Sequence, residues 1–169
     1  FFFFEYFLDE EVKISSQNEI SNNKVEDGNT VKEISYESND NEGNKYIINA
    51  DSGTFKDDNK DEIFMTNVKA TIKFNDGNNV FLSSKFAKYN TLNNDTNFYD
   101  DVNLKYLDHK IKSDNIDVFF KDSYISAYNN LIYNNLDVNL IADKVEMDLL
   151  TKNSKIFMFD KSKVKIIKD

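Results

Sequence analysis

Apolar and polar residues alternate strictly over several stretches of this chain, and this alternation predicts β-strands. In residues 68–74 the side chains of Val68, Ala70, Ile72 and Phe74 share one face, and the intervening residues are polar. A period of two residues is typical of a strand with one buried face. Comparable stretches follow one another from residue 31 to residue 167, separated by turns rich in Asn and Asp. The pattern predicts an all-β protein with about ten antiparallel strands and no helix.

The strands belong to a repeat of roughly 30 residues. One series consists of small residues, each followed by a charged one, at Ala50, Ser84, Ser113 and Ala142. A second series runs beside the first and consists of Asn67-Val68, Asp101-Val102, Asn130-Leu131 and Lys163-Val164. A unit of this length cannot bury its apolar face alone and must stack on copies of itself. We therefore expect one domain built as a stack of strand pairs.

The first eight residues are strongly apolar but too short to span a bilayer, which takes about 20 residues. We interpret residues 1–8 as the end of an N-terminal transmembrane anchor. The following acidic residues, Asp9, Glu10 and Glu11, would then emerge on the non-cytoplasmic side. Residues 9–30 are mostly polar and are interpreted as a linker. Residues 31–169 form the predicted β-domain.

Composition excludes several functions. The net charge is −9, all 21 basic residues are Lys, and the sequence contains no dense cluster of them, so nucleic acid is not an expected partner. Cys is absent, which excludes disulfides, thiol catalysis and thiolate metal sites. Pro is also absent, so no strand lacks an amide donor. The 15 Phe and 9 Tyr residues suit β structure.

Candidate catalytic and metal sites are few. His109 is the single His and lies in a predicted four-residue turn, where an exposed polar role is the simpler interpretation. Residues 57–62 begin like a calcium loop, but Glu62 and Val68 occupy the positions that need Gly and Glu. Ser83 and Ser84 have no neighbouring base. We therefore expect no enzymatic activity, no cofactor and no metal.

The repeat resembles that of the LptC family of lipopolysaccharide export proteins. The resemblance covers nearly the whole chain and is carried by residues 46–51, 63–68, 82–90, 98–102 and 111–114. The same superfamily includes LptA. An apolar N-terminal segment followed by a polar linker also fits LptC. The composition departs from the family pattern, because it is unusually rich in Asn and Lys and contains only 4 Gly.

The resemblance implies an open, V-shaped antiparallel β-jelly roll that carries lipopolysaccharide in an apolar groove. It implies a single-pass inner-membrane protein with its domain in the periplasm. The implied partners are lipopolysaccharide, the inner-membrane ABC transporter formed by LptB, LptF and LptG, and LptA. The expected groove residues are Ile72, Phe74, Val102, Leu104, Tyr106, Ile116, Val118, Phe120, Val138 and Leu140. The expected partner-binding edge strands contain Ile34, Tyr36, Val164 and Ile166.

Two other functions remain open from the residues alone. A structural β-solenoid of the cell surface would use the same repeat with a filled core and no lipid ligand. A carbohydrate-binding sandwich would need exposed aromatic platforms, for which the Tyr residues could serve. An apolar segment of about 20 residues preceding the chain would favour the lipid carrier, and many further repeats would favour the solenoid.

Overall fold

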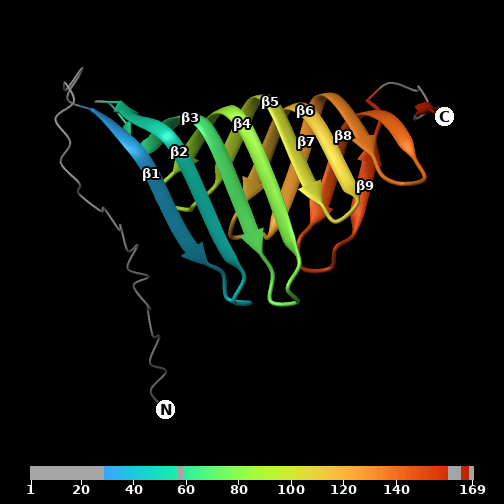
Figure 1. Ribbon diagram of the computed structural model, residues 1–169, viewed down its shortest axis with the longest axis horizontal. Helices are drawn as coiled ribbons and strands as arrows, with labels where there is room; N and C mark the ends of the chain where they lie inside the picture. Colours follow the sequence, from blue (N-terminus) through green and yellow to red (C-terminus); the bar gives the residue numbers. More distant parts are fainter. Residues whose placement is uncertain (1–28, 57–58, 160–164, 168–169) are drawn as a thin grey trace, which may run out of the picture.

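Ten β-strands make up the fold in the computed structural model, which describes residues 29–56, 59–159 and 165–167 (Figure 1). The strands are β1 (Thr30–Asn39), β2 (Lys45–Lys56), β3 (Asn59–Lys73), β4 (Asn79–Asn90), β5 (Thr96–Tyr106), β6 (His109–Phe119), β7 (Tyr124–Asn134), β8 (Asn139–Asp148), β9 (Ser154–Phe157) and β10 (Lys165–Ile167). Every element in these ranges is a strand, which confirms the all-β prediction. In the same ranges there is also no helix that could cross a membrane.

The strands form one antiparallel sheet in which chain neighbours pair with each other. The order runs from β1 to β8 without a crossover, and the short strands β9 and β10 both pair with β8. The turns that join the long strands are short and are closed by Asn and Asp side chains, such as Asp40 in the turn after β1. Within the described residues the two ends of the sheet do not pair, so the sheet stays open.

Each long strand bends near its middle, where the small residues of the repeat lie. The hydroxyls of Ser84 and Ser113 donate to the carbonyl oxygens two residues ahead, at 2.7 Å for Phe86 and 3.0 Å for Asn115. The pairing register shifts at the same places, between Ser83 and Phe86 and between Lys112 and Asn115. An extra residue in one strand of a pair bends that strand and increases its twist.

The second series of the repeat occupies the same bends on the partner strands. Asn67, Asp101 and Asn130 have positive φ angles of 50°, 55° and 51°. Asn and Asp adopt this left-handed conformation more readily than most other residues, which accounts for their recurrence at this position. The amide of Asn67 also donates to Asp51 across the bend at 2.8 Å. The fourth member of the series, Lys163, lies outside the described residues.

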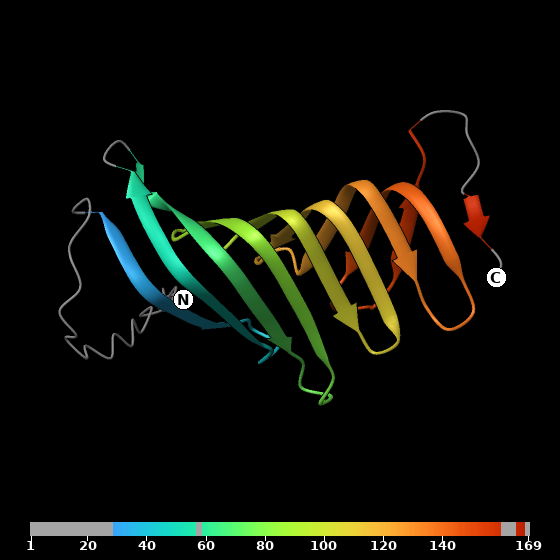
Figure 2. The same cartoon turned by 45° about the horizontal axis from the view of Figure 1, so that its top comes forward.

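The bends fold the sheet into two layers that face each other (Figures 1 and 2). Layer A consists of residues 34–39, 45–50, 68–73, 79–84, 102–106, 109–113, 131–134, 139–142 and 165–167. Layer B consists of residues 30–32, 52–56, 59–66, 86–90, 96–99, 115–119, 124–128, 144–148 and 154–157. Most apolar side chains of both layers point inward and form one core, with Ile63, Ile116 and Leu131 fully buried. This single sheet folded over a core is a β-jelly roll.

Several boundaries differ from the sequence predictions. Near the C-terminus the sequence pattern predicts one strand from Lys155 to Ile167, whereas the structure has two short strands, β9 and β10, on different parts of β8. The pattern also predicts a strand from Lys45 to Ala50, whereas β2 continues through its bend to Lys56. Strand β1 begins at Thr30, the last residue of the predicted linker. The predicted anchor, residues 1–8, and linker residues 9–28 lie outside the described residues, as does Val164.

Candidate functional site

The ten residues predicted to line a groove all point into the space between the two layers. Layer A or the turns at its ends provide Ile72, Phe74, Val102, Leu104, Tyr106, Val138 and Leu140, and layer B and the turn that follows β6 provide Ile116, Val118 and Phe120. Eight of them are buried, whereas Tyr106 and Val138 are only partly buried. The alternation within each strand places these side chains on the inner face, and the bends bring the two inner faces together. The result is an apolar surface that is continuous from β1 to β8.

The space between the layers is almost filled by side chains. A cavity of about 30 Å³ remains, lined among others by Tyr36, Tyr46, Ile72, Tyr89, Phe98 and Val118. A volume of that size holds about one water molecule and is far too small for an acyl chain. A long apolar ligand therefore requires the side chains, or the two layers, to move apart.

At one end of the molecule, side-chain contacts close the space between the layers. The ring of Tyr36 stacks on Tyr89 with 5.0 Å between centroids, and Tyr46 meets Phe120 edge-on at 4.7 Å. Both pairs join layer A to layer B. We call the part of the interior closed by these two pairs the covered end. Aromatic pairs of this geometry stabilise by roughly 0.5–1.5 kcal/mol beyond the area that they bury.

The tyrosines of the covered end stay neutral and hydrogen-bonded. The Tyr46 hydroxyl donates to Asp40 at 3.2 Å, and the Tyr89 hydroxyl donates to Asn94 at 2.6 Å. Burial, with a smaller contribution from the neighbouring Tyr36, raises the pKa of Tyr89 to about 12. Burial also raises the pKa of Tyr46, and the charge of Asp40 raises it further. The covered end therefore presents apolar rings and uncharged hydroxyls to the interior.

The opposite part of the same inner surface is less covered. Tyr106, His109, Tyr133 and Val138 lie at the turn ends of β5 to β8 in layer A and remain partly exposed. The layers are offset, since Tyr46 on β2 already meets Phe120 after β6, and Lys152 after β8 lies over Phe74 at the end of β3. The early strands of layer A therefore already face the last elements of layer B. Within the described part of the chain, the turn ends of β5 to β8 in layer A have no strand of layer B opposite them. We call the four residues Tyr106, His109, Tyr133 and Val138 the uncovered end.

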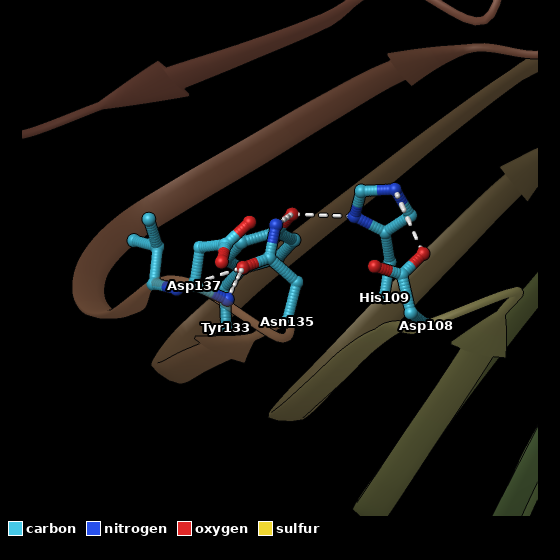
Figure 3. A network of polar contacts seen from close by, with 6 residues as sticks. Asp108, His109, Tyr133, Asn135 and Asp137 are labelled. Atoms are coloured by element: carbon cyan, nitrogen blue, oxygen red, sulfur yellow. Dashed lines mark hydrogen bonds and ion pairs between the residues drawn. The ribbon is translucent and has the colours of Figure 1, made fainter. Parts of the chain in front are cut away.

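Aromatic rings lie next to one another along the uncovered end, and Figure 3 shows His109 and Tyr133 with their polar partners. The imidazole of His109 stacks on Tyr106 with 6.3 Å between centroids and lies 5.8 Å from the ring of Tyr133. Its Nδ1 is hydrogen-bonded to the Tyr133 hydroxyl, which also accepts a bond from the Asn135 amide at 3.2 Å. Asp108 lies 3.7 Å from the other ring nitrogen. This network holds the rings in place at the uncovered end.

The turn predicted to contain His109 is shorter than expected. The turn contains only Leu107 and Asp108, and His109 is the first residue of β6 with a partly buried ring between two tyrosines. Its position two residues before the buried Ile111 was the available signal, because residues two apart in a strand share a face. In the described residues no group of His and acidic side chains could hold a metal ion.

Three of the four predicted edge residues, Ile34, Tyr36 and Ile166, are described and lie in the strands at the two ends of the sheet. In β1, Ile34 is buried and Tyr36 partly buried, so both side chains belong to the interior, while the free backbone edge of β1 is available to a partner. Ile166 lies in β10, where it pairs with Leu140 of β8. Sequence reasoning missed Tyr46, Tyr89 and Phe98, which line the cavity. The apolar and polar alternation within each strand indicates that these residues face inward. It does not indicate which strand of the other layer lies opposite them.

Comparison with known proteins agrees with the geometry. Residues 2–159 match the family model described as lipopolysaccharide-assembly, LptC-related. The chain belongs to the LptC family. Membership implies a role in lipopolysaccharide transport. Proteins of this family are membrane-associated periplasmic components of that process. A comparison with curated proteins gave no match.

Proposed function

We propose that this LptC-family protein carries the acyl chains of lipopolysaccharide between its two layers and passes the lipid on without chemical change. It receives lipopolysaccharide from an inner-membrane ABC transporter of LptB, LptF and LptG and delivers it to LptA. Residues 1–8 belong to a membrane anchor that keeps the domain in the periplasm. The observation that supports this proposal is the continuous apolar inner surface, which ends in a partly exposed row of aromatic side chains.

Lipid enters at the uncovered end in this proposal. The rings of Tyr106, His109 and Tyr133 offer apolar surface that is already accessible, whereas the covered end is closed by Tyr36, Tyr46 and their partners. When an acyl chain moves further inward, it separates side chains of the two layers that contact each other only through apolar packing. The strand ladders run within the folded sheet and need not break, so the layers can part at the cost of side-chain contacts.

The open edges of the sheet are the proposed docking strands. β1 pairs with one neighbour, and β10 continues layer A at the other end of the sheet. An exposed strand edge can add a strand from another protein through main-chain hydrogen bonds. We propose that β1 joins the periplasmic part of the transporter and that β10 joins LptA.

A purely structural repeat protein would also have an interior filled by side chains, with only a small cavity left. Site-specific photo-crosslinking separates the two functions. A photo-crosslinking residue at Val118, which is buried and faces inward, should capture lipopolysaccharide during transport. The matched control is the adjacent Asp117, which faces outward on β6. Equal labelling at both positions, or none at Val118 while transport proceeds, would contradict lipid binding between the layers.

The docking strand is tested separately from the groove. Ile166→Pro removes an amide donor and fixes φ, so it should abolish LptA binding in a pull-down, whereas Lys165→Ala should leave it unchanged. Circular dichroism must show that the variant is folded, and crosslinking at Val118 should persist. Wild-type LptA affinity in a folded Ile166→Pro variant would exclude β10 as the docking strand.

A further inference from the structure

The outer face of layer A carries a concentration of positive charge in an otherwise acidic protein. From β3 to β8, every outward-facing residue of layer A is basic, neutral polar or apolar, and none is acidic. The basic side chains on this surface are Lys69, Lys73, Lys105, Lys110 and Lys112. The protein has a net charge of −9, so this distribution is far from uniform. We call these five residues the lysine face; the strands that carry it lie side by side in Figure 1.

The lysines of this face differ from those of layer B in their partners. On layer B, Lys88 contacts Glu62 at 3.2 Å and Lys144 contacts Glu146 at 2.6 Å. None of the five lysines of the lysine face makes an ion pair with any residue of the described ranges. Their charge is therefore available to a partner outside the chain.

The fold also places two of these lysines directly opposite each other. Lys105 of β5 and Lys110 of β6 are register partners in neighbouring strands. Like charges at opposed positions destabilise a sheet. A negatively charged surface in contact with this face would relieve the repulsion, so the arrangement favours an anionic partner.

Apolar side chains stand among the charges. Phe81 is 50% exposed and pairs with Lys105, and Ile132 and Ile141 are 42% and 40% exposed on the same face. A hollow of about 420 Å³ lies over this region and is lined by Phe81 and four of the lysines. Lysines surrounding exposed aromatic and aliphatic side chains are typical of surfaces that lie on anionic membranes, where the charges meet headgroups and the apolar groups enter the interface.

We propose that the lysine face of layer A binds the surface of a bilayer containing anionic phospholipids. The lysines extend from β3 to β6, which is roughly 14 Å at the usual strand spacing. This distance is wide enough to contact several lipid headgroups and is larger than the diameter of a single phosphate group. The proposal is independent of the groove, because the lysine side chains point away from the interior. The sequence did not show this face, since its lysines are scattered over residues 69–112 and only the sheet brings them together.

Vesicle binding tests the proposal. The full chain is sedimented with vesicles of phosphatidylcholine alone or of phosphatidylcholine mixed with phosphatidylglycerol. Each lysine near an anionic surface contributes about fivefold to partitioning, so the double variant Lys105→Gln/Lys110→Gln should lose roughly 25-fold on the mixed vesicles. Salt near 1 M should abolish the difference between the two lipids, because it screens charges beyond about 3 Å.

A matched double variant, Lys88→Gln/Lys144→Gln, removes the same charge from layer B and should bind as the unmodified chain does. The apolar residues 1–8 are present in every variant, so their contribution to vesicle binding cancels. Equal binding to both vesicle types, or equal losses in the two double variants, would overturn the proposal. So would a lysine-dependent dimer without lipid, because the lysine face would then be covered by a second copy of the chain.

Discussion

The covered and uncovered ends of the interior are built from the same kind of strand, but their surroundings differ. At the covered end Tyr46 is 7% exposed and contacts Phe120 of the other layer. At the uncovered end Tyr133 has the corresponding inward position but contacts His109 of its own layer. The difference arises because the two layers are offset across the interior. A folded sheet can therefore have a permanent core and a partly exposed apolar surface on one continuous inner face.

This comparison also separates stability from function. Contacts between the layers hold the fold closed, and at the covered end they include the ring pairs of Tyr36 with Tyr89 and of Tyr46 with Phe120. The aromatic row of the uncovered end is held by hydrogen bonds within layer A and contributes little to closure. Substitutions at the covered end should accordingly affect stability more than substitutions at the uncovered end.

The largest effect is expected from truncating an aromatic ring at the covered end. Phe120→Ala removes the ring that meets Tyr46 and leaves a cavity between the layers, which should lower the free energy of unfolding by about 3–5 kcal/mol. Tyr133→Ala, at the uncovered end, should cost less than half as much because its ring is partly exposed and faces no ring of layer B. Urea denaturation followed by circular dichroism measures both.

The neighbouring Phe119 provides a control of the same size. It lies on the outer face of layer B and contacts Tyr124, so Phe119→Ala should cost clearly less than Phe120→Ala. Similar losses for Phe120→Ala and Tyr133→Ala would show that the two ends are equally packed and would remove the distinction between them.

The sequence predicted the parts of this architecture that depend on local alternation. It predicted that Leu104 and Val118 face inward, because alternation determines the face of each residue in a strand. The Asn and Ser series indicated a repeat, and the structure shows that Asn67 and Ser84 mark bends. It did not predict the offset between the layers, since that follows from the twist accumulated over several strands and bulges. Consequently neither the Tyr46 contact with Phe120 nor the grouping of the lysines could be read from the chain.

A smaller effect is expected from removing one hydroxyl at the covered end. Tyr46→Phe keeps the ring against Phe120 but loses the hydrogen bond to Asp40. Asp40 retains its bonds from the backbone and side chain of Asn44, both at 2.8 Å, so no acceptor is left without a partner. The free energy of unfolding should fall by about 1 kcal/mol. A loss as large as that of Phe120→Ala would mean that the hydroxyl, and not the ring contact, closes this end.

The smallest effect is confined to alkaline pH and depends on Tyr89. Burial is the main cause of its raised pKa, about 12 in the folded protein against an ordinary value of 10.0. A phenol whose pKa is higher in the folded state loses its proton more readily in the unfolded state. Its contribution to stability is complete below about pH 10 and disappears as the pH rises to about 12. Tyr89→Phe should therefore reduce the fall in melting temperature over this range, measured by circular dichroism. Tyr133→Phe is the control, because it removes a tyrosine hydroxyl at the uncovered end. Lysine deprotonation at alkaline pH lowers the melting temperature of both variants equally. An alkaline profile altered more by Tyr133→Phe would show that the uncovered end is the more buried of the two.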